Sequence, residues 1–428
     1  MVQALLISFF LLMLFGIPVG FAVMGSCFVY FIVGAITGDG PSIMMAAQKI
    51  MTGIDSFPLM AIPFFVVAGE FMSTGGITKK LMDAARALVG HLRGGIAQVV
   101  ILASTMFAAM SGSSIACASI FGKMMIPEME KDGYDRGFGS AVVACASTVG
   151  PIIPPSISII VYAVIASCSA GQLLISGIIP GVIMSAGMML AAYLISVRCN
   201  YPTRPKLSAS ERGKAIVNAI IPMMMPVIMI GGIATGWFTA TEAAVVSVVY
   251  ATIIGLVGRN LKIKDFINIG FGAFLGVGRT MLIIAACNLF GWILTFEGVN
   301  KIIENFLLGI TTNPLGIMTI INVVVLILGM FMESGSIIIM CTPIFVPIIK
   351  SLGIDPIHFG IMFVINTMIG GVTPPVGLLM YITNDLAHST MAEYIKFAWP
   401  FFLSLIITLF LVMFFPPVAT WLPGLLFS

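Results

Sequence analysis

Long apolar runs separated by short polar stretches dominate the pattern of this 428-residue chain. Several runs exceed the roughly 18 apolar residues that mark a membrane-spanning helix. Examples lie at Ala4 to Ile36, Leu173 to Val197, Ala215 to Ala234 and Phe397 to Phe415. The first run continues past Pro18, so we interpret it as a membrane helix rather than a signal peptide. The pattern predicts an all-α polytopic membrane protein.

Two of the apolar runs contain the same phrase, in which a glycine precedes a pair of adjacent prolines. The first copy runs from Thr148 to Ser158 and the second from Met368 to Leu378. A helix cannot continue through two prolines without losing backbone hydrogen bonds. Each copy therefore predicts a broken helix, one at about 137–169 and one at about 357–386. Paired breaks in corresponding positions of two halves indicate the binding site of a secondary transporter.

A tip of small residues interrupts another apolar segment in each half. The tips, Ser111 to Ser114 and Ser334 to Ser336, predict helical hairpins at about 96–127 and about 314–350. The first arm, Ile96 to Met110, would be about 22 Å long, short of the roughly 30 Å hydrocarbon core. We therefore expect re-entrant hairpins, one from each side of the membrane. The alternative is that each arm spans the bilayer, but the internal symmetry favours re-entry.

The distribution of charged residues predicts which side of the membrane each polar segment faces. The chain is 59% hydrophobic and 9% charged, and its net charge of +3 is spread over loops, which predicts no nucleic-acid binding. Basic residues gather in Lys79 to Arg93, Arg198 to Lys214 and Arg259 to Lys264, which we place in the cytoplasm. The counterpart of the first segment in the second half, Asn300 to Asn313, holds a single lysine. The two halves are therefore expected to be inverted repeats.

Several other classes of function find no support in the sequence. There is no nucleotide-binding loop, so we expect an ion gradient rather than ATP to supply the energy. Seven cysteines without a CxxC pair and three scattered histidines predict neither a zinc or iron site nor a disulfide framework. We expect no organic cofactor. A membrane enzyme is the weakest interpretation, because no catalytic constellation is present.

The breaks and the tips predict complementary chemistry. Prolines remove N–H donors but leave carbonyls, and Thr373 adds a hydroxyl in the second break, so these oxygens suit a hard cation such as sodium. Ser113, Ser114 and Ser336 are expected to begin the second arms, where N-cap hydroxyls and free N–H groups attract carboxylates. These four hydroxyl residues are the predicted substrate contacts. The arrangement favours cotransport of an organic acid with sodium.

Other polar residues inside apolar segments have more limited expected roles. Glu333 directly precedes the second tip and Asp385 follows the second break, so both are candidates for tuning the site. Gly150 and Gly370 are expected to let the chain turn and approach a neighbour closely. Three asparagines are expected to form hydrogen bonds between packed helices. They are Asn322, Asn366 and Asn384.

The chain resembles the large membrane subunit of the TRAP transporters, the tripartite ATP-independent periplasmic family. The resemblance covers nearly the whole chain and rests on both proline phrases, both tips, and phrases at Gly16 to Gly20, Phe64 to Gly76 and Thr342 to Pro347. It implies a bacterial inner-membrane location, a separate small membrane subunit and a periplasmic solute-binding protein. The implied cargo is a C4-dicarboxylate, sialic acid or another sugar or keto acid.

The resemblance also implies two sodium sites and an elevator mechanism. Carried over by motif, the sites fall at Ser113, Ser114, Gly150, Ile153 and Pro155, and at Gly335, Gly370, Thr373 and Val376. The implied moving transport domain comprises 57–171 and 279–390, and the scaffold comprises 1–56, 172–278 and 391–428. Two alternatives stay open. One is a carboxylate transporter that needs no binding protein, and the less favoured one is an ion channel that uses the breaks as a filter.

Overall fold

The structure, a computed structural model, describes residues 1–38, 40–74, 76–258 and 263–427, and these ranges contain helices and no strand. Eight of the helices are long and apolar enough to cross a membrane, or nine if α3 and α4 form one bent span. The third basic segment, Arg259 to Lys264, lies mostly outside the described residues. The all-α polytopic class predicted from the sequence is confirmed.

The first half begins with two separate helices where the sequence indicated one continuous apolar run. α1 ends before Gly16, whose φ of 76° reverses the chain, and α2 packs back against α1. The helices of this half are α1 (Val2–Leu14), α2 (Val19–Thr37), α3 (Ile43–Ile54), the 3-10 turn η1 (Phe57–Met60), α4 (Ala61–Thr74), α5 (Ile77–Val89), α6 (Gly95–Ser111), α7 (Ser114–Lys131), α8 (Arg136–Ser147), α9 (Ile157–Ala166) and α10 (Ala170–Ser176).

The rest of the chain repeats part of this order after a block of long helices. Its helices are α11 (Ile178–Arg198), α12 (Ala209–Ala234), α13 (Ala240–Val257), α14 (Ile263–Phe296), α15 (Val299–Ile310), α16 (Pro314–Phe331), α17 (Ser334–Ser351), α18 (Pro356–Val372), α19 (Leu378–Ala387), α20 (Met391–Phe414) and α21 (Pro417–Leu426). The final stretch, expected as one scaffold helix, is two helices, because Pro416 and Pro417 end one and start the next.

Both predicted hairpins form, and the first has the predicted tip. α6 and α7 turn at Gly112, whose φ is 61°. The second hairpin, α16 and α17, turns at Met332 and Glu333, so its tip lies just before the predicted Ser334 to Ser336. Each arm of the second hairpin has 18 residues, or about 27 Å, close to the roughly 30 Å hydrocarbon core. Re-entry of the hairpins therefore stays a prediction.

Both broken helices also form, and the contacts between them show that they run antiparallel. Near the end of the first, the Tyr162 hydroxyl donates to the Pro356 carbonyl at 2.8 Å, at the start of the second. Near the start of the first, the Ser140 hydroxyl donates to Thr383 Oγ1 at 3.0 Å. α8 thus packs on α19 and α9 on α18, so that each arm of one broken helix lies against the opposite arm of the other. This is the pairing expected of inverted repeats.

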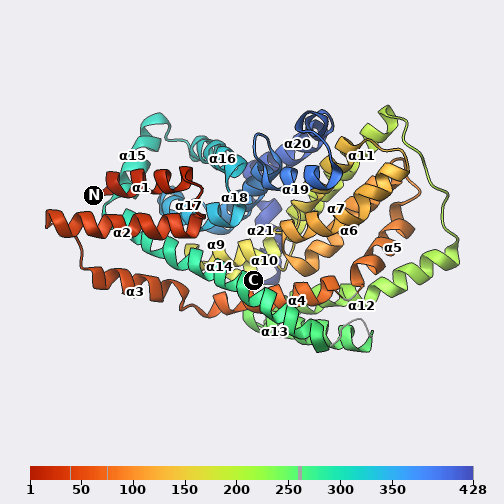
Figure 1. Cartoon of the computed structure of the whole chain (residues 1–428), viewed down its shortest axis with the longest axis horizontal. Coiled ribbons are helices and arrows are strands. Elements are labelled where there is room, and N and C mark those ends of the chain that lie inside the picture. Colours follow the sequence, from red (N-terminus) through yellow and green to blue (C-terminus); the bar gives the residue numbers. More distant parts are fainter. Residues whose placement is uncertain (39, 75, 259–262, 428) are drawn as a thin grey trace.

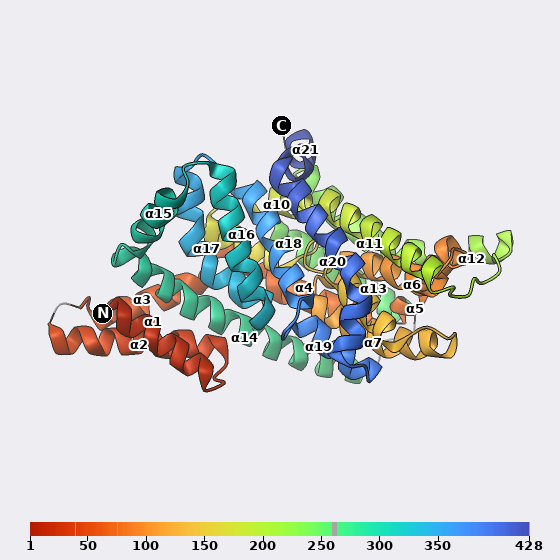
Figure 2. The same ribbon diagram turned by 90° about the horizontal axis from the view of Figure 1, so that it is seen from above.

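The hairpins close the core around these two helices. α7 packs on both α8 and α19, and α17 packs on both α18 and α9, so each second arm touches both broken helices. In Figures 1 and 2, α1 and α2 lie at one end of the long axis, and α5, α6, α11 and α12 lie at the other. The long helix α14 packs on α17, the second arm of the second hairpin.

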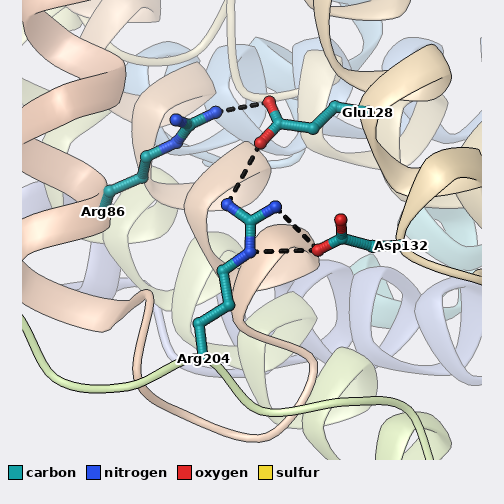
Figure 3. Close-up of polar contacts among 4 residues, drawn as sticks. All are labelled: Arg86, Glu128, Asp132 and Arg204. Carbon is teal, nitrogen blue, oxygen red and sulfur yellow. Dashed lines mark hydrogen bonds and ion pairs between the residues drawn. The ribbon is translucent and has the colours of Figure 1, made fainter.

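Ion pairs join two of the basic segments at one end of the molecule (Figure 3). Arg204, in the loop after α11, bonds Asp132 at 2.7 Å and Glu128 at 3.2 Å, and Glu128 also bonds Arg86 of α5. Partial burial lowers the pKa of Arg204, but the bonds to Asp132 and Glu128 outweigh it and raise that pKa. The first two basic segments therefore lie at the same end, as the charge pattern predicted.

Candidate functional site

The first break is built directly against the first hairpin tip. A Cβ on Gly112 would lie 2.4 Å from the Pro155 carbonyl oxygen, and a Cβ on Gly150 would lie 3.0 Å from the backbone between Ser113 and Ser114. Gly150 has no positive φ, so it serves close approach and not the turn expected from the sequence. The backbones of tip and break are therefore in contact, and only residues without a side chain fit between them.

The second break has the same relation to the second hairpin, with different contacts. A Cβ on Gly370 would lie 2.5 Å from the Gly329 Cα, so Gly370 too serves close approach rather than a turn. The Gly377 N–H donates to the Met330 carbonyl at 3.0 Å. The Thr373 hydroxyl donates to the Ile369 carbonyl at 2.6 Å, which leaves its oxygen able to accept or to bind a cation.

A small cavity joins the two hairpin tips and the first break. We name it the tip cavity; its volume is about 140 Å³. Its lining includes the first residues of three helices, because Ser114 begins α7, Ile157 begins α9 and Ser334 begins α17. Unpaired N–H groups and the helix dipole give each N-terminus a partial positive charge. Three such ends at one cavity make a site suited to an anion such as a carboxylate.

The same cavity also carries groups that suit a cation. Glu333, the residue before α17, has the only charged side chain among the described residues that line it. Pro151 of the first break lines the cavity beside the tip of the first hairpin. Five residues with hydroxyl groups also line the cavity: Ser113, Ser114, Ser158, Thr280 and Ser334. The site therefore offers anion-attracting and cation-attracting groups a short distance apart.

The first implied sodium set is largely brought together. Ser113 and Ser114 lie against Gly150, and the neighbouring Gly112 lies against Pro155. The side chain of Ile153 points away from the tip, towards Gly181 of α11. Ile153 could therefore contribute to a sodium site only through its backbone, because its side chain packs on α11.

The second implied sodium set is divided between places. Gly335 lines the tip cavity, whereas Gly370 contacts Gly329 of the first arm. Val376 lines a separate cavity of about 560 Å³ together with Asp385. Asp385 is therefore beside the second break, as its spacing suggested, and Glu333 is in the tip cavity.

Two of the four predicted substrate contacts line the tip cavity. They are Ser113, the N-cap of α7, and Ser114. Ser336 does not line it, and the prediction that it begins the second arm is wrong, because α17 begins at Ser334 with Glu333 as N-cap. Ser336 is instead the third residue of α17 and is buried. Thr373 does not line the cavity either.

Sequence reasoning did not assign three of the hydroxyl residues that line the cavity to the site: Ser158, Thr280 and Ser334, the last of which it named only as part of the second tip. Ser158 lies inside the first proline phrase, so a signal for it existed. Thr280 had none, because only the packing of α14 against α17 brings it to the site. The asparagine prediction is confirmed: the Asn366 amide donates to the Asn322 carbonyl and side chain at 2.7 and 2.8 Å. Asn384 accepts from Ser140 at 2.6 Å, which joins α19 to α8.

Two solved structures share the fold of this chain. The YdaH transporter of Alcanivorax borkumensis has a TM-score of 0.65 at 11% identity, over 87% of this chain and 88% of its own. MtrF of Neisseria gonorrhoeae, described among antimetabolite efflux pumps, has a TM-score of 0.59 at 12% identity, over 86% and 83%. The chain therefore shares the all-helical fold of these two structures.

Sequence comparison gives the family. The family model "Tripartite ATP-independent periplasmic transporter, DctM component" matches residues 6–418, and the chain belongs to this family. It is 36% identical to the sialic acid TRAP transporter large permease SiaM of Vibrio cholerae, over 96% of this chain and 95% of that protein. It is 37% identical to the C4-dicarboxylate large permease DctM of Pseudomonas aeruginosa, over 90% of each. The protein is a multi-pass subunit of the inner membrane.

Proposed function

We propose that this protein imports an organic acid together with sodium ions, and that it receives the acid from a periplasmic solute-binding protein. A small membrane subunit completes the transporter. The tip cavity carries this proposal, because three helix N-termini there suit a carboxylate while Glu333 and the first break suit a cation.

Relatives indicate the class of cargo. Besides the sialic acid and C4-dicarboxylate permeases, the 2,3-diketo-L-gulonate large permease YiaN of Escherichia coli is 32% identical over 94% of this chain and 94% of its own. All three cargoes carry at least one carboxylate. We propose that the cargo of this protein shares that group, which the N-termini of α7, α9 and α17 bind.

In the proposed mechanism, the two hairpins and two broken helices move together as a transport domain. They carry acid and sodium past a scaffold of α1 to α3, α11 to α13, α20 and α21. Sodium binds at the breaks and neutralises part of the charge near the carboxylate, so that the loaded domain crosses the membrane more easily than the half-loaded one.

Reconstitution tests this proposal. The large and small subunits are reconstituted into liposomes, and the binding protein is added outside. Uptake of labelled sialic acid, succinate and 2,3-diketo-L-gulonate is then measured with and without an inward sodium gradient. We expect uptake of at least one acid that requires both sodium and the binding protein. Undiminished uptake without the soluble protein would overturn the binding-protein part. Single-channel currents in a bilayer would overturn the carrier mechanism itself.

A further inference from the structure

A larger cavity lies beyond the tip cavity and contains no residue that the sequence assigned to a site. We name it the outer cavity; its volume is about 450 Å³. α3, α14, α17 and the end of α9 enclose it. Its polar lining residues include Lys49, Thr52, Ser56, Ser167, Asn288 and Thr295. A cavity of this size and polarity has room for a small hydrophilic molecule.

The outer cavity and the tip cavity follow one another along the same three helices. Ile339 of α17 lines both cavities. On α14, Thr280 lines the tip cavity and Ile284, four residues on and therefore on the same helix face, lines the outer cavity. On α9, Val161 lines the first and Ile165 the second. A molecule that left the outer cavity along these faces would reach the hairpin tips.

Lys49 is the only charged side chain among the described residues that line the outer cavity. Its ammonium lies 5.8 Å from the centroid of the Trp292 ring, within the range of a cation–π interaction. None of the described ion pairs includes Lys49. The aromatic ring therefore positions the ammonium without neutralising it, so its charge is available to an anion.

Two other roles for a lysine at this place fit the structure less well. A lysine on a membrane-surface helix commonly extends towards lipid phosphates, but Lys49 is half-buried and lies over a ring that belongs to the cavity. If a second cation lined either cavity, it could attract the anion in place of Lys49. Arg279, next to Thr280 on α14, is exposed and lines neither cavity.

We propose that the outer cavity is a second anion site, in which Lys49 receives the carboxylate of the cargo before the acid moves to the hairpin tips. This inference builds on the proposed function. Lys49 supplies a full positive charge that attracts an acid from solution, whereas the tips supply only partial charges of helix ends. The carboxylate thus passes from a strong, accessible cation to a more enclosed site whose hydroxyls and N–H groups select it.

Quenching of Trp292 fluorescence tests the anion site without any transport. The probe is iodide, and the protein is a variant in which Trp237, Trp399 and Trp421 are replaced by phenylalanine. We expect the Stern–Volmer constant for iodide to fall about twofold or more in Lys49→Met and to persist in Lys49→Arg, because only the charge concentrates iodide beside the ring. Neutral acrylamide should quench all three proteins alike. Equal iodide constants, or parallel changes with acrylamide, would overturn the proposal.

Uptake by the complete transporter tests the link to the cargo. With the acid that the wild type transports best, we expect Lys49→Met to raise KM about tenfold and to change the maximal rate less than twofold. Lys49→Arg should stay near the wild type. Lys396→Met is the matched control, because Lys396 also lies over a ring, 5.0 Å from the centroid of Phe397, but lines neither cavity. An unchanged KM in Lys49→Met would overturn the proposal.

Two further outcomes have separate meanings. If the KM defect of Lys49→Met exists only in vesicles that contain phosphatidylglycerol, Lys49 binds lipid phosphate and the proposal is overturned. If the wild type transports no organic acid while iodide quenching still depends on Lys49, the proposed function fails and the anion site stands.

Discussion

Gly112 is a residue at which the first hairpin lies in close contact with the first break. It combines two demands that only glycine meets together. Its φ of 61° lies in the left-handed region, and an added Cβ would lie 2.4 Å from the Pro155 carbonyl oxygen. Gly133, after α7, has a φ of 82° but open space around the position of a Cβ. A substitution of Gly133 therefore tests backbone strain alone, whereas a substitution of Gly112 tests strain together with close contact.

We expect Gly133→Ala to lower the free energy of unfolding by about 1 kcal/mol and to leave uptake nearly intact, because it adds left-handed strain alone. Gly112→Ala should reduce uptake at least tenfold, since Pro155 and the tip must separate to admit the methyl group. Uptake in proteoliposomes and thermal unfolding in detergent measure the two effects. Equal uptake by both variants would show that contact between the tip and the break is not needed for transport.

Thr373 supplies a hydroxyl at the second break, where the first break has Ile153. Because the hydroxyl proton is donated to the Ile369 carbonyl, the lone pairs of the oxygen can accept a hydrogen bond or bind a cation. We expect Thr373→Val to raise the sodium concentration for half-maximal uptake several-fold, with folding preserved because valine has nearly the same shape. Thr373→Ser should keep the wild-type sodium dependence. A sodium titration that is identical for threonine and valine would remove this residue from the coupling site.

At the scale of elements, the loop between α11 and α12 is held to the first hairpin by charge. Arg204 bonds both Asp132 and Glu128 at the end of α7. We expect Arg204→Ala to lower the free energy of unfolding by about 1 kcal/mol, since partly exposed ion pairs contribute little each but here form a network. Arg136→Ala is the control, because it removes a single pair to Glu130 whose side chains are 52% and 46% exposed.

Thermal unfolding in detergent at low and high salt measures this difference. The loss in Arg204→Ala should shrink as salt screens the network. If Arg136→Ala were as destabilising as Arg204→Ala, the network would have no special weight over an isolated pair.

Much of the element order follows from the sequence, for identifiable reasons. The double prolines fix both breaks, because no helix tolerates them, and Gly112 fixes the first tip through its positive φ. The second tip was misplaced because Ser334 to Ser336 are small and polar, yet they continue comfortably as the first residues of α17. The turn there occurs at Met332 and Glu333, whose residue types carry no turn signal.

The site was harder to predict than the elements, because it depends on which helices meet. Ser113 and Ser114 were found because tip and break belong to one repeat unit. Thr280 and Lys49 were not, since each lies on an ordinary-looking helix and gains its place only through the packing of α14 on α17 and of α3 on α14. A sequence repeat shows which segments of the two halves correspond. It does not show which flanking helices pack against those segments.

At the scale of the whole molecule, the proposed elevator motion requires the transport domain to slide along the scaffold. One contact between the two lies between α6 and α11, where the hydroxyl oxygens of Thr105 and Ser185 are 2.7 Å apart. A matched contact lies inside the transport domain, where the hydroxyl oxygens of Ser140 and Thr383 are 3.0 Å apart. In both pairs the side chains point at each other, as a disulfide requires.

We expect the double variant Thr105→Cys/Ser185→Cys to lose uptake more than tenfold on oxidation and to regain it with dithiothreitol, because the cross-link fixes α6 to α11 and the mechanism needs them to move apart. Ser140→Cys/Thr383→Cys should keep its uptake when oxidised, because both positions travel together. The parent protein with its seven native cysteines, treated with the same oxidant, gives the background. Undisturbed uptake by a fully cross-linked α6–α11 pair would mean that this contact does not slide during transport. The moving unit would then have to exclude α6 or include α11.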